Sequence, residues 1–235
     1  MGNWLKTILF LLVSAFLTHL LPFSSFFRNL DTMIHEFGHA LVTLALSGKV
    51  MYIELFVDHS GVTYSMVTKS WSLIPISLAG YATASLFAMF LFISYAEGRQ
   101  RLGLQLITLI AVVCLLLFVR NQFGIFWLIG FIALNIVMLA LAPRWLLHFY
   151  YLLLAFLSLE ESVFGPLTLA VSAYLDPSKA GDATNLARTT GIPAIAWGAL
   201  FSLFALWCAK RAIQAFAFGR RKRSKPRQPA VTRYE

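Results

Sequence analysis

The stretch MIHEFGHALVTLALSG, residues 33–48, decides how the rest of the chain is interpreted. Its apolar residues are typical of a helix that enters a membrane, yet it carries two histidines and a glutamate. Asn29 or Asp31 can cap the free N–H groups at the start of such a helix, and Gly48 can end it. The sequence therefore predicts a helix that is short for a complete membrane span, which needs about 20 residues.

The whole chain has the composition of a polytopic membrane protein. Of its 235 residues, 59% are hydrophobic and 12% are charged, and the mean hydropathy is +0.76. Residues 4–22 are interpreted as a first transmembrane helix and not as a cleaved signal peptide, because the apolar core is long and no small-residue cleavage site follows it. Five further runs can each span a bilayer: 71–95, 102–119, 123–142, 145–170 and 191–213. We expect an all-α polytopic membrane protein with six or seven transmembrane helices.

Residues 48–68 have a different pattern, which predicts a small interfacial β-hairpin. VMYIELFV and VTYSMV are two β-rich runs on either side of the turn tetrad DHSG. A hairpin cannot leave its backbone bare in lipid, so we expect it at the membrane interface or in a protein-lined cavity. The hairpin and the helices together form a single predicted domain over residues 1–214.

The positive charge of the chain is concentrated near its end, where GRRKRSKPRQ follows an apolar helix. The positive-inside rule places such a segment in the cytoplasm. Residues 215–235 are therefore expected to be a disordered cytoplasmic tail that contacts anionic lipid, with no nucleic-acid partner. Alternation of the spans puts Arg99, Arg101 and Arg144 on the same side. The predicted location is a bacterial-type cell membrane, with the protein crossing it several times.

His35, Glu36 and His39 have the spacing of a zinc site. On a helix that advances about 100° per residue, the two histidines lie about 40° apart, so both imidazoles can reach one cation. This is the H-E-x-x-H pattern, in which two histidines bind Zn²⁺ and the glutamate is the general base. Ionisable groups in an apolar helix are costly and usually functional. We therefore predict His35 and His39 as metal ligands and Glu36 as the catalytic base.

A catalytic zinc ion takes three protein ligands, so one more must come from elsewhere in the chain. Asp182 is the preferred candidate, because GDATNLARTTGIP places it at the head of a short helix beside the last span. The same position also suits a simple helix N-cap. Asp176, in the sequence YLDP, is the alternative third ligand.

Two distant stretches, HEFGHALVTLALSGKV and GDATNLARTTGIPAIAWG, resemble the site-2-protease-like intramembrane zinc metallopeptidases, in particular their compact branch without a PDZ domain. The resemblance covers the motif helix, the hairpin and residues 176–200. The other spans are similar only in being apolar. It implies that Asp182 binds zinc together with both motif histidines and that the hairpin offers an edge to an unwound substrate. Better-known members carry N-P-D-G or L-D-G at the third ligand. Neither occurs here, and Leu175-Asp176-Pro177 is the nearest literal match, so Asp176 stays open.

The predicted function is a zinc metalloendopeptidase that hydrolyses peptide bonds of membrane-protein or peptide substrates in the lipid bilayer. The first alternative is a catalytically silent zinc-binding scaffold. Only the intact Glu36 favours the enzyme over this alternative. The second alternative is a membrane transporter. That class commonly has repeated halves and several charged residues in its spans, and the sequence shows neither.

Overall fold

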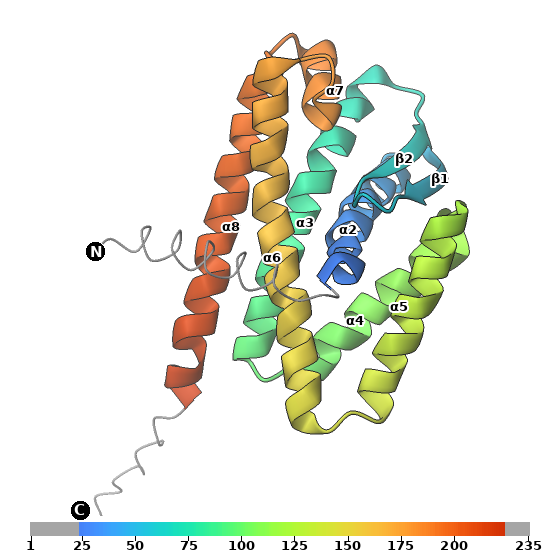
Figure 1. The fold of residues 1–235 in the computed structure, drawn as a ribbon. Coiled ribbons are helices and arrows are strands. Elements are labelled where there is room, and N and C mark those ends of the chain that lie inside the picture. The colour runs from blue at the N-terminus through green and yellow to red at the C-terminus, as the bar shows by residue number, and fades with distance from the viewer. Residues whose placement is uncertain (1–23, 224–235) are drawn as a thin grey trace, which may run out of the picture.

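The computed structural model describes residues 24–223, which form a bundle of helices with one small hairpin attached (Figure 1). In chain order the elements are α2 (Ser24–Ala45), β1 (Lys49–Leu55), β2 (Gly61–Met66), η1 (Ser70–Ser72), α3 (Leu73–Ala96), α4 (Gln100–Val113), the π-helical η2 (Cys114–Phe118), α5 (Gln122–Ala140), α6 (Arg144–Leu175), α7 (Gly181–Thr190) and α8 (Ala194–Arg223). Helix α3 packs against both α2 and α8, and α6 packs against α2 and α8. Helix α2 is therefore held inside the bundle.

Within the described residues, 5 helices are long and apolar enough to cross a membrane, and they coincide with the five predicted runs. They are Ser70–Ala96, Gln100–Phe118, Gln122–Ala140, Arg144–Leu175 and Ala194–Ala217. Large apolar side chains on their outer faces, such as Leu102, Phe126 and Leu203, are exposed as lipid contact requires. The predicted class, an all-α integral membrane protein with a small hairpin, is confirmed. The predicted first span, residues 4–22, lies outside the described residues.

Helix α2 begins earlier than the sequence predicted. It already includes Ser24, the first residue that the structure describes, so the predicted caps Asn29 and Asp31 lie inside the helix. In the part of the helix that the sequence did not predict, the carbonyl of Phe26 accepts a hydrogen bond of 2.7 Å from the indole N–H of Trp127 in α5, which ties this part to the bundle. With 22 residues α2 is long enough to span, but its charged residues keep it out of the group of apolar helices.

A buried ion-pair cluster joins α2 to α6. The Nη2 atom of Arg28 lies 2.8 Å from Oε1 of Glu160, and Nη1 of Arg28 contacts Glu161. Only 3% of the Glu160 side chain is exposed. Since separating a buried charge from its partner is costly, this cluster fixes the position of α2 relative to α6.

Strands β1 and β2 form the predicted antiparallel hairpin, and the outer edge of β1 is covered by the chain before α5. Ile53 forms a parallel bridge with Val119, and its carbonyl accepts the N–H of Arg120 at 3.1 Å. The Asn121 side chain accepts the N–H of Leu55 at 3.1 Å and donates to the Leu55 carbonyl at 2.6 Å. β1 is thus paired on both sides, whereas no strand among residues 24–223 pairs with the other edge of β2.

One face of β2 lies on α2 and is held there by hydroxyl groups. Successive side chains of a strand point to opposite faces, so Thr63 and Ser65 share a face. Ser65 Oγ lies 3.0 Å from Thr43 Oγ1, and Thr32 Oγ1 donates to the carbonyl of His59 in the turn at 2.6 Å. These contacts place the hairpin directly beside the HEFGH motif, against protein and not bare in lipid.

Helix α7 is short and lies at one end of the bundle, beside the ends of α6 and α8 (Figure 1). It packs against α3 and α8, burying Ala183 and Leu186, and it ends at Gly191, which has a φ of 76° that favours glycine. Helix α8 then continues to Arg223, past residue 215, where the sequence predicted the start of the tail. Residues 224–235 of that predicted tail lie outside the described residues.

Candidate metal centre

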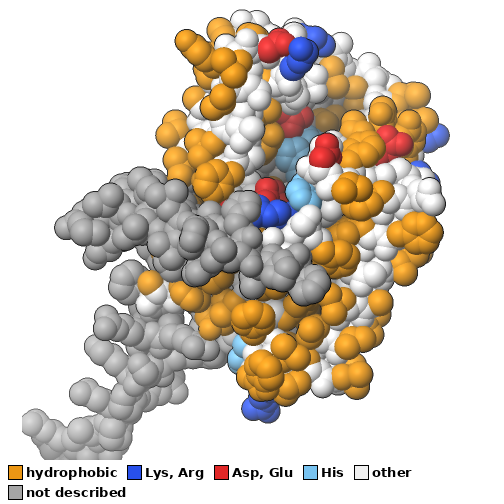
Figure 2. Space-filling model, in the orientation of Figure 1, with side chains coloured by type: hydrophobic (Ala, Val, Ile, Leu, Met, Phe, Trp, Pro, Cys, Tyr) orange, Lys and Arg blue, Asp and Glu red, His pale blue; other side chains and the backbone are white. Residues whose placement is uncertain are grey.

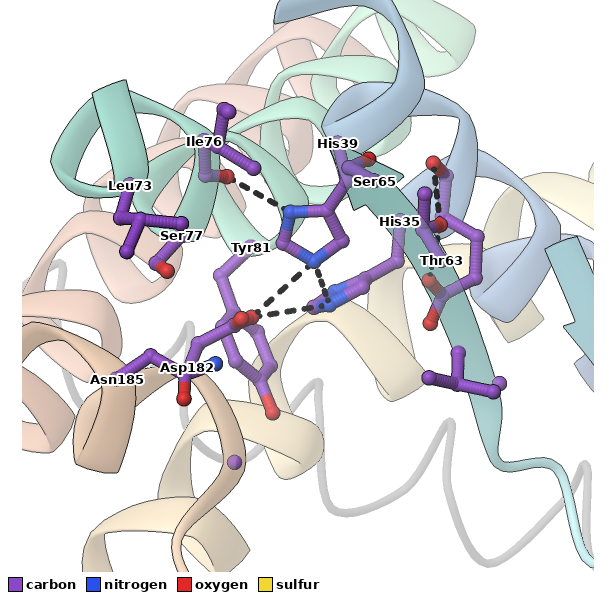
Figure 3. A pocket seen from close by; sticks show the side chains of 14 residues that line it. His35, His39, Thr63, Ser65, Leu73, Ile76, Ser77, Tyr81, Asp182 and Asn185 are labelled. Carbon is purple, nitrogen blue, oxygen red and sulfur yellow. Dashed lines mark hydrogen bonds and ion pairs between the residues drawn. The ribbon is translucent and has the colours of Figure 1, made fainter. Parts of the chain in front are cut away.

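The two motif histidines lie side by side on α2. Because they are one helical turn apart, they share a face. The Nε2 atoms of His35 and His39 are 3.0 Å apart, and the two rings meet edge to face (Figure 3). Helix α2 thus presents both imidazoles to the same space.

Asp182 joins the two histidines from α7. Its Oδ2 atom lies 3.2 Å from Nε2 of His35 and 3.3 Å from Nε2 of His39 (Figure 3). Between residues 24 and 223, no other group of three His, Cys, Asp or Glu side chains has donor atoms close enough together to hold one metal ion. The packing of α7 against α3 is what brings Asp182 to this position.

Asp176 lies outside this group of donor atoms. Its Oδ1 atom accepts hydrogen bonds from the N–H of Ser178 at 3.1 Å and from the Ser178 hydroxyl at 2.6 Å, and Oδ2 lies 3.0 Å from Nζ of Lys179. Hydrogen bonds from Ser178 and Lys179 lower the pKa of the Asp176 carboxyl below its ordinary value. The carboxylate is thus used within the turn between α6 and α7.

The two histidines favour the ionised form of the Asp182 carboxyl group. Burial acts to raise its pKa, but the adjacent His39 and His35 act more strongly in the opposite direction, and the pKa lies below its ordinary value. Metal ions bind the ionised form of a carboxyl group. Asp182 therefore offers an anionic oxygen beside two imidazole nitrogens.

Contacts with α3 orient the two imidazoles. Nδ1 of His39 lies 2.7 Å from the carbonyl oxygen of Ile76, and since a carbonyl can only accept, Nδ1 carries the proton and donates it. In the neutral form of His39, which binds metal, this hydrogen bond leaves the lone pair on Nε2, the atom that faces His35 and Asp182. The His35 ring packs edge-on against Tyr81, with ring centroids 4.5 Å apart.

The donor atoms and the space between them fit a zinc ion. Zinc binds nitrogen and oxygen at about 2.0–2.2 Å in tetrahedral geometry, which separates neighbouring ligand atoms by about 3.4 Å. The separations here are 3.0, 3.2 and 3.3 Å. Gly80 of α3 keeps the space open, because a Cβ atom there would lie 2.6 Å from Nε2 of His39 and would also collide with Nε2 of His35.

Glu36 lies on the wall of the same cavity, and the hairpin holds its carboxylate. Only 4% of Glu36 is exposed, and its Oε2 atom accepts a hydrogen bond of 2.6 Å from the hydroxyl of Thr63 (Figure 3). Gly61 allows the close approach, since a Cβ atom there would lie 2.8 Å from Oε1 of Glu36. An acid–base group and three donor atoms around one cavity are the parts that metal-assisted hydrolysis needs.

The cavity has a volume of about 360 Å³. Figure 2 shows acidic and histidine side chains gathered in a hollow of the largely hydrophobic surface. Sequence reasoning did not identify Thr63, Gly80 or Tyr81 as cavity residues, although a glycine inside an apolar run and the alternation of GVTYS were visible signals. The lining residues come from α2, β2, α3 and α7: His35, Glu36, His39, Gly61, Val62, Thr63, Ser65, Leu73, Ile76, Ser77, Tyr81, Gly181, Asp182 and Asn185.

Comparison with known proteins identifies the family. The sequence model of the Peptidase M50B-like family matches residues 6–211, which is most of the chain. No curated protein and no solved structure gives a significant match. The matched region contains the motif helix, the hairpin and α7, and the M50 family consists of zinc-dependent metallopeptidases of the site-2-protease type. The chain therefore belongs to the Peptidase M50B-like family of intramembrane metallopeptidases.

Proposed function

We propose that the protein is an active intramembrane zinc metalloprotease that hydrolyses peptide bonds of membrane-protein substrates. The observation that carries this proposal is the convergence of donor atoms from His35, His39 and Asp182 in a cavity that the carboxylate of Glu36 also lines. Membership of a metallopeptidase family supports the same reaction class. Five helices that can cross a membrane support a substrate that reaches the site from the bilayer.

In the proposed reaction the two histidines and Asp182 hold the zinc ion. When bound, the ion would act as a Lewis acid that polarises the substrate carbonyl and lowers the pKa of a bound water. Oε1 of Glu36 takes a proton from the attacking water, while Oε2 stays bound to Thr63. As the new C–O bond forms and the C–N bond breaks, Glu36 passes this proton to the leaving amine.

The substrate must be unwound before attack, because the peptide groups of a transmembrane helix are hydrogen-bonded to one another. The unwound segment could be held by β2, because Val62, Thr63 and Ser65 of this strand line the cavity. In our proposal the segment adds to β2 as a further strand, and backbone hydrogen bonds supply much of its affinity.

The proposed orientation places the C-terminus in the cytoplasm of a bacterial-type cell. Arg99, Arg101 and Arg144 belong to the joints at the end of the bundle where α8 also ends (Figure 1). The positive-inside rule assigns that end to the cytoplasm. The hairpin and α7 lie at the other end of the bundle, so the metal centre would lie nearer the opposite side of the membrane.

The test compares Glu36→Gln and His35→Ala in the purified, detergent-solubilised protein. Zinc content and cleavage of a synthetic transmembrane peptide are measured together. We expect Glu36→Gln to keep zinc and lose cleavage, and His35→Ala to lose both. Glu97→Gln, at an exposed joint, is the matched control and should behave as the wild type does. Cleavage that survives in Glu36→Gln would contradict the proposal, and a wild type that holds zinc without cleaving would indicate the silent scaffold.

A further inference from the structure

The hairpin does more than border the cavity, because one of its side chains binds the proposed general base directly. The Oγ1 atom of Thr63 lies 2.6 Å from Oε2 of Glu36 and 3.1 Å from the backbone carbonyl of the same residue. We propose that Thr63 is a positioning residue that sets the orientation of the Glu36 carboxylate for proton transfer. This inference rests on the proposed protease function.

The contact is strong and well anchored. A hydroxyl that donates to a carboxylate over 2.6 Å makes a short, charge-assisted hydrogen bond. Thr63 is β-branched and has few side-chain rotamers, and it pairs across the hairpin with Ile53, which is 1% exposed. Glutamate has more freedom, so the hydrogen bond restrains Glu36 and not the reverse.

Gly61 leaves room for the second carboxylate oxygen of Glu36, Oε1. It lies two residues before Thr63 on the same face of β2, and a Cβ atom there would meet both Cγ and Oε1 of Glu36 at 2.8 Å. With glycine at this position, Oε2 is bound by Thr63 and Oε1 is left for the water. The G-x-T pattern of β2 thus fits a carboxylate that uses its two oxygens for different tasks.

The same strand would also contact the substrate. The outer edge of β1 is occupied by Val119 and Asn121, whereas β2 borders the cavity. A substrate strand on β2 would hydrogen-bond to the backbone of the strand whose Thr63 side chain holds Glu36. Thr63 would then belong to the strand that binds the substrate while its side chain orients the base.

The test is a steady-state comparison of Thr63→Val, which keeps the shape but removes the donor, with Thr63→Ser, which keeps the donor. We expect Thr63→Val to bind zinc as the wild type does and to lower kcat about 10- to 100-fold with little change in KM. Thr63→Ser should restore most of kcat. Thr43→Val, which removes a buried hydroxyl from the same α2–β2 contact without touching Glu36, should leave kcat unchanged.

An unchanged kcat in Thr63→Val, a change in KM alone, or a Thr63→Ser variant as slow as Thr63→Val would overturn the inference while leaving the protease function intact. Loss of zinc in Thr63→Val would show a structural role and would also overturn it. If Thr63→Val does not fold, Thr63→Ala removes the same donor without adding bulk and is judged by the same criteria. A wild type that binds zinc but does not cleave the peptide contradicts the proposed function itself, and this inference with it.

Discussion

The carboxylate of Asp182 lies 3.2 Å from the imidazole of His35, although the two residues belong to helices far apart in the sequence. Helix α7 has little apolar surface of its own, and it is held by packing Ala183 and Leu186 against α3 and α8. The position of Asp182 therefore depends on the whole bundle. Its proposed role can be tested separately from that of the motif.

Replacing Asp182 should empty the metal centre, whereas replacing Asp176 should not. We expect Asp182→Ala to lower the zinc affinity by at least an order of magnitude, because a ligand bond is lost. Asp176→Ala removes only the contacts with Ser178 and Lys179, so its zinc content should equal that of the wild type. Metal analysis after dialysis against a weak chelator measures both. Zinc loss in Asp176→Ala alone would reverse the assignment.

A methyl group at position 80 should exclude the metal ion without unfolding the protein. In Gly80→Ala the new Cβ would collide with Nε2 of both imidazoles and take up space that the ion needs. We expect the zinc content to fall close to zero while the helical circular dichroism is retained. Gly130→Ala is the matched control, since a Cβ there would meet nothing closer than 3.9 Å. Full zinc occupancy in Gly80→Ala would mean that the ion does not lie between the donor atoms identified here.

The Arg28 cluster should contribute strongly to stability. Arg28→Met leaves Glu160 without this buried cation, and we expect a loss of about 3–5 kcal/mol in the free energy of unfolding. In the ion pair of Arg99 with Glu97 both side chains are exposed, so Arg99→Gln should change the free energy of unfolding by less than about 1 kcal/mol. Unfolding by SDS titration in mixed micelles measures both variants. Equal effects would show that the cluster does not hold α2 against α6.

The orientation in the membrane can be read from two engineered cysteines. Lys179→Cys lies in the exposed turn before α7, and Glu97→Cys lies in the exposed joint at the other end of the bundle. The native Cys114 and Cys208 are buried and should give little background. In intact cells, an impermeant thiol reagent should label Lys179→Cys and not Glu97→Cys. The reverse pattern would place the metal centre nearer the cytoplasm.

Local sequence patterns were sufficient to predict most of the helices and strands, but not the polar contacts between them. The five apolar runs and the two β-rich runs could be located because the length of an apolar run and the position of turn residues are features of the local sequence. The sequence predicts a start of α2 that is too late, because Asn29 and Asp31 are good helix caps in isolation. The contact between Phe26 and Trp127, which ties the earlier part of the helix to α5, joins residues that are far apart in the sequence.

The membrane class, the hairpin and the shared face of His35 and His39 follow from hydropathy, β-rich runs and helical spacing alone. That Asp182 and not Asp176 lies beside the histidines, that Gly80 leaves room between them and that Thr63 binds Glu36 became visible in the folded bundle. These contacts join separate helices and a strand. Their distances depend on how the bundle packs, which no local pattern encodes.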